Sequence, residues 1–148
     1  GVKRARSLAK WLHSPLAIID KRRAKANVSE VMNIIGDVKG KKAILIDDMI
    51  DTAGTICNAA AALKEKGAIE VYGCATHAIF SGPAVERLKE SAFSEIVVTD
   101  TVELPEDKIF DKLRVLSTSK MFAETIKRVV VSEAISDLFE MPIEDREY

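Results

Sequence analysis

The chain has 148 residues, of which 47% are hydrophobic and 30% charged, and its formal net charge is −1. This composition is typical of a folded globular domain and excludes the class of disordered chains with low hydrophobicity and high charge. The near-neutral charge and the lack of any apolar run of ~20 residues also lead us to expect neither a nucleic-acid partner nor a membrane partner.

Short apolar runs alternate with stretches of helical period, which is the pattern of βαβ units and predicts an α/β fold built on a parallel sheet. In chain order the pattern predicts a helix at 2–13, strands at 16–20 and 43–48, a helix at 55–66, a strand at 71–75, a helix at 83–90 and a strand at 95–99. Gly67 follows the helix at 55–66, where we expect a left-handed cap. Parallel α/β folds normally begin with a strand. Because this chain opens on a helix, we expect that strand to precede Gly1.

The last third is predicted to contain a polar, proline-bearing loop to about residue 108, a short strand at 113–116 and a further helix. Ser117 or Ser119 is expected to cap this helix, in which apolar residues at 122, 126 and 129 or 130 recur at helical spacing. Residues 132–139 are compatible with a helix or an extended tail. We expect one domain over residues 1–140 and a frayed tail over 141–148.

The two cysteines, Cys57 and Cys74, stand in apolar surroundings. They lack CxxC spacing and have no paired histidines nearby, which argues against a zinc site and against a disulfide framework. A reducing, cytoplasmic location fits this pattern best.

The most informative segment covers residues 43–55, where a buried strand runs into two adjacent carboxylates, Asp47 and Asp48. A short loop then enters the next helix with the sequence Asp51, Thr52, Ala53, Gly54, Thr55. In open α/β sheets, ligands bind beyond the carboxyl ends of the strands. A helix N-terminus offers unpaired N–H groups and a partial positive charge, which suit a phosphate, and a glycine lets the backbone approach the anion closely. The pattern therefore predicts a phosphate site at residues 51–55.

Asp47 and Asp48 would repel that phosphate. Their carboxylates are better suited to accept hydrogen bonds from the hydroxyl groups of a sugar, with a divalent cation nearby to offset their charge. The segment is therefore expected to bind a sugar phosphate.

A basic run, Lys21, Arg22 and Arg23, follows the strand predicted at 16–20. Such a run is more often a solvated turn than part of a site. Since it follows a strand expected in the same sheet, we expect it at the same edge as the 51–55 loop.

The sequence Asp-Asp-Met-Ile-Asp-Thr-Ala-Gly-Thr at 47–55 resembles the phosphoribosyl-binding signature of the type I phosphoribosyltransferase fold, in the form found in ribose-phosphate pyrophosphokinases. The basic run and the sequence Asn-Val-Ser-Glu-Val-Met at 27–32 are similar to the flexible loop of those enzymes, and residues 76–84 and 134–139 resemble later parts of the family. The resemblance implies a three-layer, phosphoribosyltransferase-like domain that forms the C-terminal half of a synthetase.

The resemblance also implies transfer of pyrophosphate from ATP to O1 of ribose 5-phosphate, with Mg²⁺, in a homo-oligomer that is commonly a hexamer. Lys21 and Arg23 would be catalytic and would bind ATP together with Arg22, while the 5-phosphate would bind at residues 51–55 and the ribose at Asp47 and Asp48. The main magnesium ligands are expected upstream of Gly1, so this chain alone is expected to be inactive. Ser136 is the candidate regulatory residue, in a tail that lies near a regulatory phosphate site in many members of the family. Ala134 departs from the serine that is common there, which argues against ordinary regulation by phosphate and ADP. For His77 we favour a structural role.

Two alternatives stay open. A salvage phosphoribosyltransferase would share the fold and the phosphate loop but consume phosphoribosyl pyrophosphate with a base, and the basic run argues against it. A non-catalytic, synthetase-associated subunit would keep the binding loop only. The presence of Lys21, Arg23, Asp47 and Asp48 argues against this second alternative.

Overall fold

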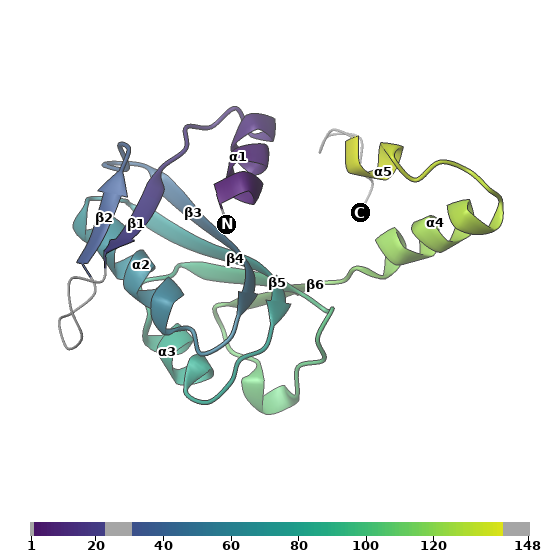
Figure 1. The fold of residues 1–148 in the computed structure, drawn as a ribbon. Helices are drawn as coiled ribbons and strands as arrows, with labels where there is room; N and C mark the ends of the chain where they lie inside the picture. Colours follow the sequence, from purple (N-terminus) through teal and green to yellow (C-terminus); the bar gives the residue numbers. More distant parts are fainter. Residues whose placement is uncertain (1, 23–30, 141–148) are drawn as a thin grey trace.

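A computed structural model of the chain describes residues 2–22 and 31–140 (Figure 1). Four parallel strands form its main sheet, in the order β3 (Lys42–Ile50), β4 (Glu70–Ala78), β5 (Glu95–Thr99) and β6 (Leu113–Leu116). Helix α2 (Gly54–Glu65) connects β3 to β4, and α3 (Ala84–Glu90) connects β4 to β5. The predicted α/β fold with a parallel sheet is therefore confirmed.

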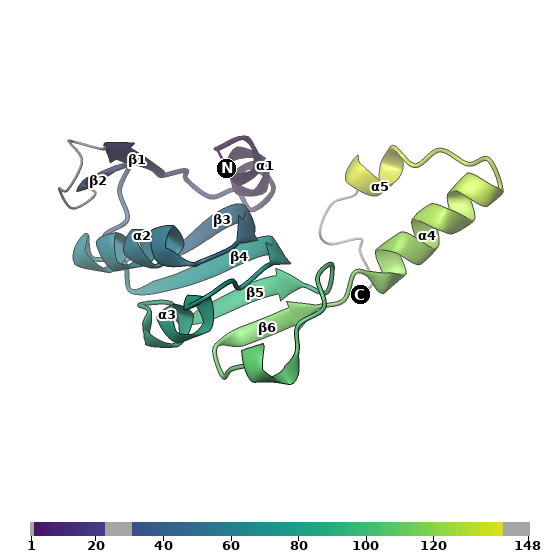
Figure 2. The ribbon, with the colours of Figure 1, turned by 60° about the horizontal axis from the view of Figure 1, so that its bottom comes forward.

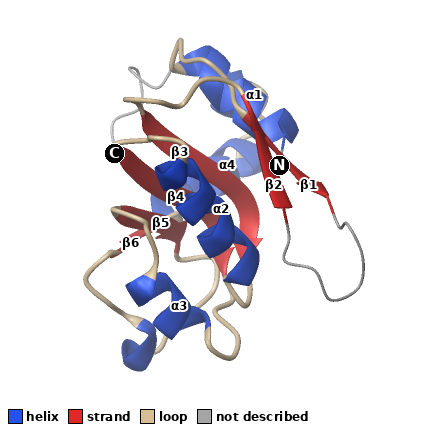
Figure 3. Cartoon of the chain, turned by 90° about the vertical axis from the view of Figure 1, so that its left-hand side faces the viewer, coloured by secondary structure: helices blue, strands red, loops and turns tan. Residues whose placement is uncertain are grey.

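One face of the sheet forms the core against α2 and α3, which lie side by side on it (Figure 3). Residues 71, 73 and 75 of β4 and residues 96 and 98 of β5 alternate along their strands and are buried there. Gly73 leaves room for Phe93, since a Cβ atom at this position would lie 3.1 Å from the Phe93 ring, which is a tight contact. Leu88 of α3 is fully buried in the same cluster.

The other face of the sheet is only partly covered. Helix α1 (Val2–Trp11) lies beside β3 on the side away from α2 and α3, and none of its residues is buried (Figures 1 and 2). Ile44 of β3 is 47% exposed and Leu116 of β6 is 46% exposed. The sheet thus has helices on both sides, but one of its two faces remains largely open.

Left-handed residues follow the ends of α1 and α2. Helix α1 ends at Trp11 rather than at the predicted residue 13, because His13 has φ 48° and the N–H of Ser14 donates back to the carbonyl of Ala9 at 2.9 Å. Gly67 has φ 92°, and the N–H of Ala68 donates to the carbonyl of Leu63 at 3.0 Å. The left-handed cap expected at Gly67 is confirmed.

The prediction that the strand at 16–20 belongs to the parallel sheet was wrong. Strand β1 (Ile18–Arg22) pairs in antiparallel fashion with β2 (Val31–Ile35), and the two form a separate sheet. The reason is the apolar segment 31–35, which offers β1 a nearby partner and which the sequence pattern did not identify as a strand. Ile19 and Ile34 pack against the main core, so the hairpin is attached to the domain through its apolar side chains.

The C-terminal part extends away from the sheet (Figure 2). A 3₁₀ turn, η1 (Glu106–Lys108), lies in the predicted loop, and α4 (Ser119–Val130) and the short α5 (Asp137–Glu140) follow β6. Neither Ser117 nor Ser119 caps α4, since Thr118 occupies the N-cap position without a side-chain capping bond. No residue of α4 is buried, and its apolar residues, such as Ile126 at 61% and Val130 at 77%, are exposed.

Candidate functional site

The site begins where β3 passes into α2. After the buried Ile50, residues 51–53 turn the chain, and Ala53 takes the N-cap position of α2 with φ 61° and ψ −3°. This left-handed conformation is uncommon for a residue with a Cβ atom, and Ala53 is only 5% exposed. No side chain caps the helix. The first N–H groups of α2 therefore have no intrahelical partner and are available to an anion.

The neighbouring loop after β4 holds this turn in place through main-chain atoms. The carbonyl of Ile50 accepts hydrogen bonds from the N–H groups of Ile79 at 3.0 Å and Phe80 at 3.1 Å, and the carbonyl of Asp51 accepts from Ser81 at 3.1 Å. Phe80 is itself left-handed, with φ 49°, and is 1% exposed. The two loops are thus joined at the C-terminal edge of the sheet.

The side chains of the turn point largely to solvent. Asp51, Thr52 and Thr55 are exposed, and Gly54 is half-buried. Within the described part of the chain, their carboxylate and hydroxyl groups have no hydrogen-bond partner. The turn can therefore offer main-chain N–H groups and two hydroxyl donors to a ligand.

Asp47 and Asp48 lie in the last part of β3, which ends at Ile50, and both are half-buried. The two neighbouring carboxylates interact with each other. Asp47 accepts a hydrogen bond from the N–H of Asp48 at 2.9 Å, and Asp48 accepts one from the N–H of Met49 at 3.0 Å. The guanidinium of Arg4 on α1 lies 3.4 Å from the Asp48 carboxylate.

These surroundings keep Asp48 ionised. Hydrogen bonding with the Asp47 side chain, and then with main-chain N–H groups, lowers the pKa of Asp48 from its ordinary value, and the charge of Arg4 lowers it further. An ionised carboxylate is an acceptor only, which suits it to bind a hydroxyl group or a cation.

His77 stands beside Met49 in the register of β4 with β3. Its Nδ1 lies 2.8 Å from the hydroxyl of Thr101, and the hydroxyls of Thr99 and Thr101 both donate to the carbonyl of Thr76, at 2.6 and 3.1 Å. The favoured structural role of His77 agrees with this network, which ties the end of β4 to the segment after β5.

Asp100 was not identified from the sequence, although it accepts three hydrogen bonds. The hydroxyls of Ser117 and Thr118 donate to its carboxylate at 2.6 Å each, and the N–H of Thr118 donates at 2.8 Å. These bonds, those of the Ser117 and Thr118 side chains first, lower the pKa of Asp100 to about 2. An acid directly after one strand and hydroxyls directly after the next were the signal, since the ends of adjacent parallel strands meet.

The basic run belongs to a different sheet from the one predicted. Lys21 and Arg22 stand in β1, whereas Arg23 and the rest of the similar loop up to residue 30 lie outside the described residues. Their expected position at the edge of the parallel sheet does not follow from sheet membership, because β1 is not part of that sheet. In Figure 3, however, β1 runs in roughly the same direction as β3.

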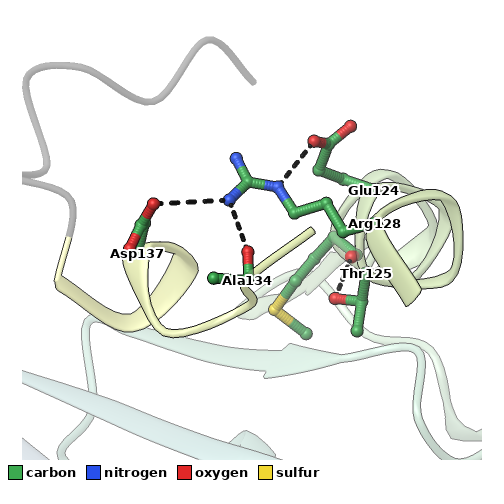
Figure 4. A network of polar contacts seen from close by, with 6 residues as sticks. Glu124, Thr125, Arg128, Ala134 and Asp137 are labelled. Atoms are coloured by element: carbon green, nitrogen blue, oxygen red, sulfur yellow. Dashed lines mark hydrogen bonds and ion pairs between the residues drawn. The ribbon is translucent and has the colours of Figure 1, made fainter. Parts of the chain in front are cut away.

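Ser136 lies between α4 and α5. In this region Arg128 contacts Glu124, Ala134 and Asp137 (Figure 4). Arg128 donates to the Glu124 carboxylate at 2.9 Å and to the carbonyl of Ala134 at 3.1 Å, and it lies 3.9 Å from Asp137. The hydroxyl of Ser136 donates to Asp137 at 3.1 Å. Its regulatory role stays a prediction, and the tail predicted at 141–148 lies outside the described residues.

Within residues 2–22 and 31–140, no three histidine, cysteine, aspartate or glutamate side chains gather in a way that could hold a metal ion. Cys57 and Cys74 are both free, and burial raises the pKa of each thiol. None of the helices in this part of the chain is long and apolar enough to cross a membrane.

A parallel sheet flanked by helices, with an acidic strand end that leads through a tight turn into a helix N-terminus, defines a phosphoribosyltransferase-like α/β domain. Residues 22–140 match the family described as Phosphoribosyl synthetase-associated domain. The chain belongs to this family.

Relatives of known name agree with this assignment. The chain is 62% identical over 138 residues to a ribose-phosphate pyrophosphokinase of Caldanaerobacter subterraneus subsp. tengcongensis, a match that covers 93% of this chain and 44% of the relative. It is 58% identical over 140 residues to the enzyme of that name from Clostridium acetobutylicum, covering 95% and 44%. The crystal structure of phosphoribosylpyrophosphate synthetase from Mycobacterium smegmatis matches with a TM-score of 0.77 and 44% identity, over 87% of this chain and 42% of that one. The chain thus spans less than half the length of the relatives it matches.

Proposed function

We propose that this chain forms the ribose 5-phosphate-binding part of a ribose-phosphate pyrophosphokinase. The reaction transfers the pyrophosphoryl group of ATP to O1 of ribose 5-phosphate and yields phosphoribosyl pyrophosphate and AMP. The observation that carries the proposal is the turn at residues 51–55, whose uncapped helix N-terminus lies at the C-terminal edge of the sheet. The reaction is inferred from the name of the chain's relatives, ribose-phosphate pyrophosphokinase.

The 5-phosphate binds at Asp51, Thr52, Ala53, Gly54 and Thr55. Unpaired N–H groups of the first turn of α2 donate to its oxygens, and the helix dipole favours its negative charge. The exposed hydroxyls of Thr52 and Thr55 add side-chain donors. The ribose hydroxyls bind to Asp47 and Asp48, which lie in the last part of β3 a few residues earlier.

Lys21 and Arg23 act on the transferring phosphates, and Arg22 joins them in binding ATP. The negative charge of a transferring phosphoryl group spreads over several oxygens, so cations that reach it stabilise the transition state more than the ground state. Arg23 offers a planar fork of donors, and Lys21 a mobile point charge.

Magnesium fits the described residues as an ion shared with the substrates. Mg²⁺ is usually held by one or two carboxylates together with substrate phosphates and water. Asp47 and Asp48 supply two neighbouring carboxylates, either of which could share such an ion with the substrate phosphates. When bound, the ion neutralises charge on the phosphates of ATP.

Four further features are proposed from the sequence pattern and from the family resemblance. We place the protein in the cytoplasm, and we assign it to a homo-oligomer, a hexamer by resemblance. The domain extends over residues 1–140, and Ser136 is the candidate regulatory residue.

The test uses the full-length protein with ATP, ribose 5-phosphate and Mg²⁺, and follows AMP and phosphoribosyl pyrophosphate. We expect both products in equal amounts. The variants Lys21→Ala and Arg23→Ala should lower kcat far more than the affinity for ribose 5-phosphate, while Lys10→Ala, which removes an exposed cation on α1, should change neither. Equal losses in kcat and affinity would reject the transition-state role. Consumption of phosphoribosyl pyrophosphate with a base would identify a salvage enzyme, and no turnover at all would identify a non-catalytic subunit.

A further inference from the structure

Arg87 is a residue of α3 whose side chain reaches the turn at residues 51–55. Its Nη1 atom donates a hydrogen bond to the main-chain carbonyl of Thr52 at 2.9 Å, although the two residues are 35 positions apart. The same nitrogen would lie 3.4 Å from a Cβ atom at Gly54. The guanidinium group therefore lies against the part of the turn that enters α2.

This hydrogen bond fixes the orientation of one peptide plane. In a trans peptide the carbonyl and the following N–H point in opposite directions, and the chain has no cis peptide among its described residues. Because the carbonyl of Thr52 points to Arg87, the N–H of Ala53 points to the other side. The bond thus sets the direction of the first donor of the turn.

The next two residues make this direction important. Ala53 is left-handed, with φ 61°, and Gly54 begins the right-handed helix. Successive N–H groups in such a pair converge and form an anion-binding nest. A left-handed alanine costs about 1–2 kcal/mol, so an external bond that holds the Thr52 carbonyl stabilises a conformation the local sequence does not favour.

The cation also differs from an ordinary structural arginine. Arg87 is exposed, and it forms no ion pair with any carboxylate in the described part of the chain. The thiol of Cys57 on α2 donates to the main-chain carbonyl of Arg87 at 3.6 Å. This contact between α2 and α3 does not involve the guanidinium. The side chain of Arg87 is therefore directed to the turn alone.

We propose that Arg87 is a positioning residue for the sugar phosphate, which acts by holding the Thr52 carbonyl so that the N–H groups of residues 53–55 converge on the 5-phosphate. This inference rests on the proposed function of the turn. It assigns to α3 a part in binding ribose 5-phosphate and none in binding ATP.

The test compares Arg87→Met, Arg87→Lys and Lys89→Met in the full-length enzyme. Arg87→Met keeps the apolar stem but removes the donor, and Arg87→Lys keeps a cation that can donate one bond. Lys89→Met is the matched control, because Lys89 is an exposed cation of the same helix. Initial rates give KM for ribose 5-phosphate, KM for ATP and kcat, and a thermal melt records stability.

We expect Arg87→Met to raise KM for ribose 5-phosphate about tenfold or more, since hydrogen bonds from charged donors are among the stronger ones. KM for ATP should stay within about twofold, Arg87→Lys should recover most of the loss, and Lys89→Met should behave like the wild type. A wild-type KM in Arg87→Met would overturn the inference while the proposed function stands. The inference would also be overturned if Arg87→Met lowered the melting temperature, raised both KM values and lowered kcat, and if Arg87→Lys did not recover these changes. A wild-type enzyme that does not use ribose 5-phosphate would overturn the proposed function and this inference with it.

Discussion

Replacing Gly54 by alanine should separate the stability of the turn from its capacity to bind phosphate. Gly54 does not have a positive φ, because it is the first residue of α2. A Cβ atom there would meet only the Arg87 guanidinium, at 3.4 Å from Nη1 and 4.0 Å from Cζ, which is ordinary van der Waals contact. The backbone and its surroundings therefore accept alanine.

The expected effect on stability is small and favourable. Alanine is up to about 1 kcal/mol better than glycine within a helix, and it also restricts the unfolded chain. For a protein of this size or larger, that corresponds to a rise in melting temperature of at most about 2–4 °C. Thermal unfolding followed by circular dichroism should show an unchanged or slightly raised melting temperature.

The expected effect on binding is large and unfavourable. The methyl group would lie against the Arg87 guanidinium that holds the Thr52 carbonyl, and would so disturb the orientation of the N–H groups that we assign to the 5-phosphate. Each hydrogen bond to a charged group contributes about 1.5–3 kcal/mol. Loss of one such bond raises KM for ribose 5-phosphate by about 10- to 100-fold. The matched control is Asn58→Ala, an exposed position one turn further along α2, which should gain helix stability and keep its KM.

Two results would refute this reasoning. A Gly54→Ala enzyme with the wild-type KM would mean that a methyl group beside Arg87 does not disturb the N–H groups that we assign to the phosphate. A fall in melting temperature of more than about 4 °C would mean that there is no room for a Cβ atom between Gly54 and the Arg87 guanidinium.

Three other predictions concern the core, the strand ends and the thiols. Leu88→Ala should lower the free energy of unfolding by about 2–5 kcal/mol in urea denaturation, because the side chain is fully buried, whereas Val130→Ala, at 77% exposed, should change it by less than about 0.5 kcal/mol. Asp100 should titrate near pH 2 in a carboxyl NMR experiment, so its contribution to stability is complete above its ordinary value of 3.8 and is lost as the pH falls towards 2; a midpoint near 4 would contradict the three hydrogen bonds. Cys57 and Cys74 should react with a thiol reagent at pH 8 more slowly than a free cysteine does and recover that rate in urea, since burial raises both pKa values; fast labelling of the folded protein would argue against this burial.

The parallel sheet was predictable because its strands are short apolar runs separated by segments of helical period. The expected strands at 95–99 and 113–116 have the bounds of β5 and β6, and the helix expected at 55–66 differs from α2 by one residue at each end. Once these elements are in order, the turn at 51–55 must lie at the carboxyl edge of the sheet. That position needed no knowledge of contacts.

The antiparallel hairpin was not predictable in the same way. An apolar run of five residues indicates a strand but does not indicate which strand it pairs with. Strand β1 pairs with β2. The expectation that the basic run follows a strand of the parallel sheet was wrong because this pairing information was missing. Which strands pair depends on tertiary structure, and the pattern of apolar residues within one segment does not predict it.

The contacts of the turn show a second limit. Nothing in the residues around position 87 indicates that Arg87 reaches Thr52, because their proximity follows from the packing of α3 beside α2. The left-handed Ala53 is also unexpected, since glycine or asparagine is the usual choice for that conformation. The Asp100 contacts, by contrast, could have been found by comparing the residues that follow neighbouring strands.

The bonds from residues 79–81 to the carbonyls of Ile50 and Asp51 have a consequence for how this protein can change through evolution. All three donors are main-chain N–H groups, which every amino acid except proline possesses. The side chains at positions 79 and 81 can therefore vary without removing the bonds, whereas Phe80 is also constrained by its burial in the core and by its left-handed backbone. Substitution by proline is the change that this junction should not tolerate.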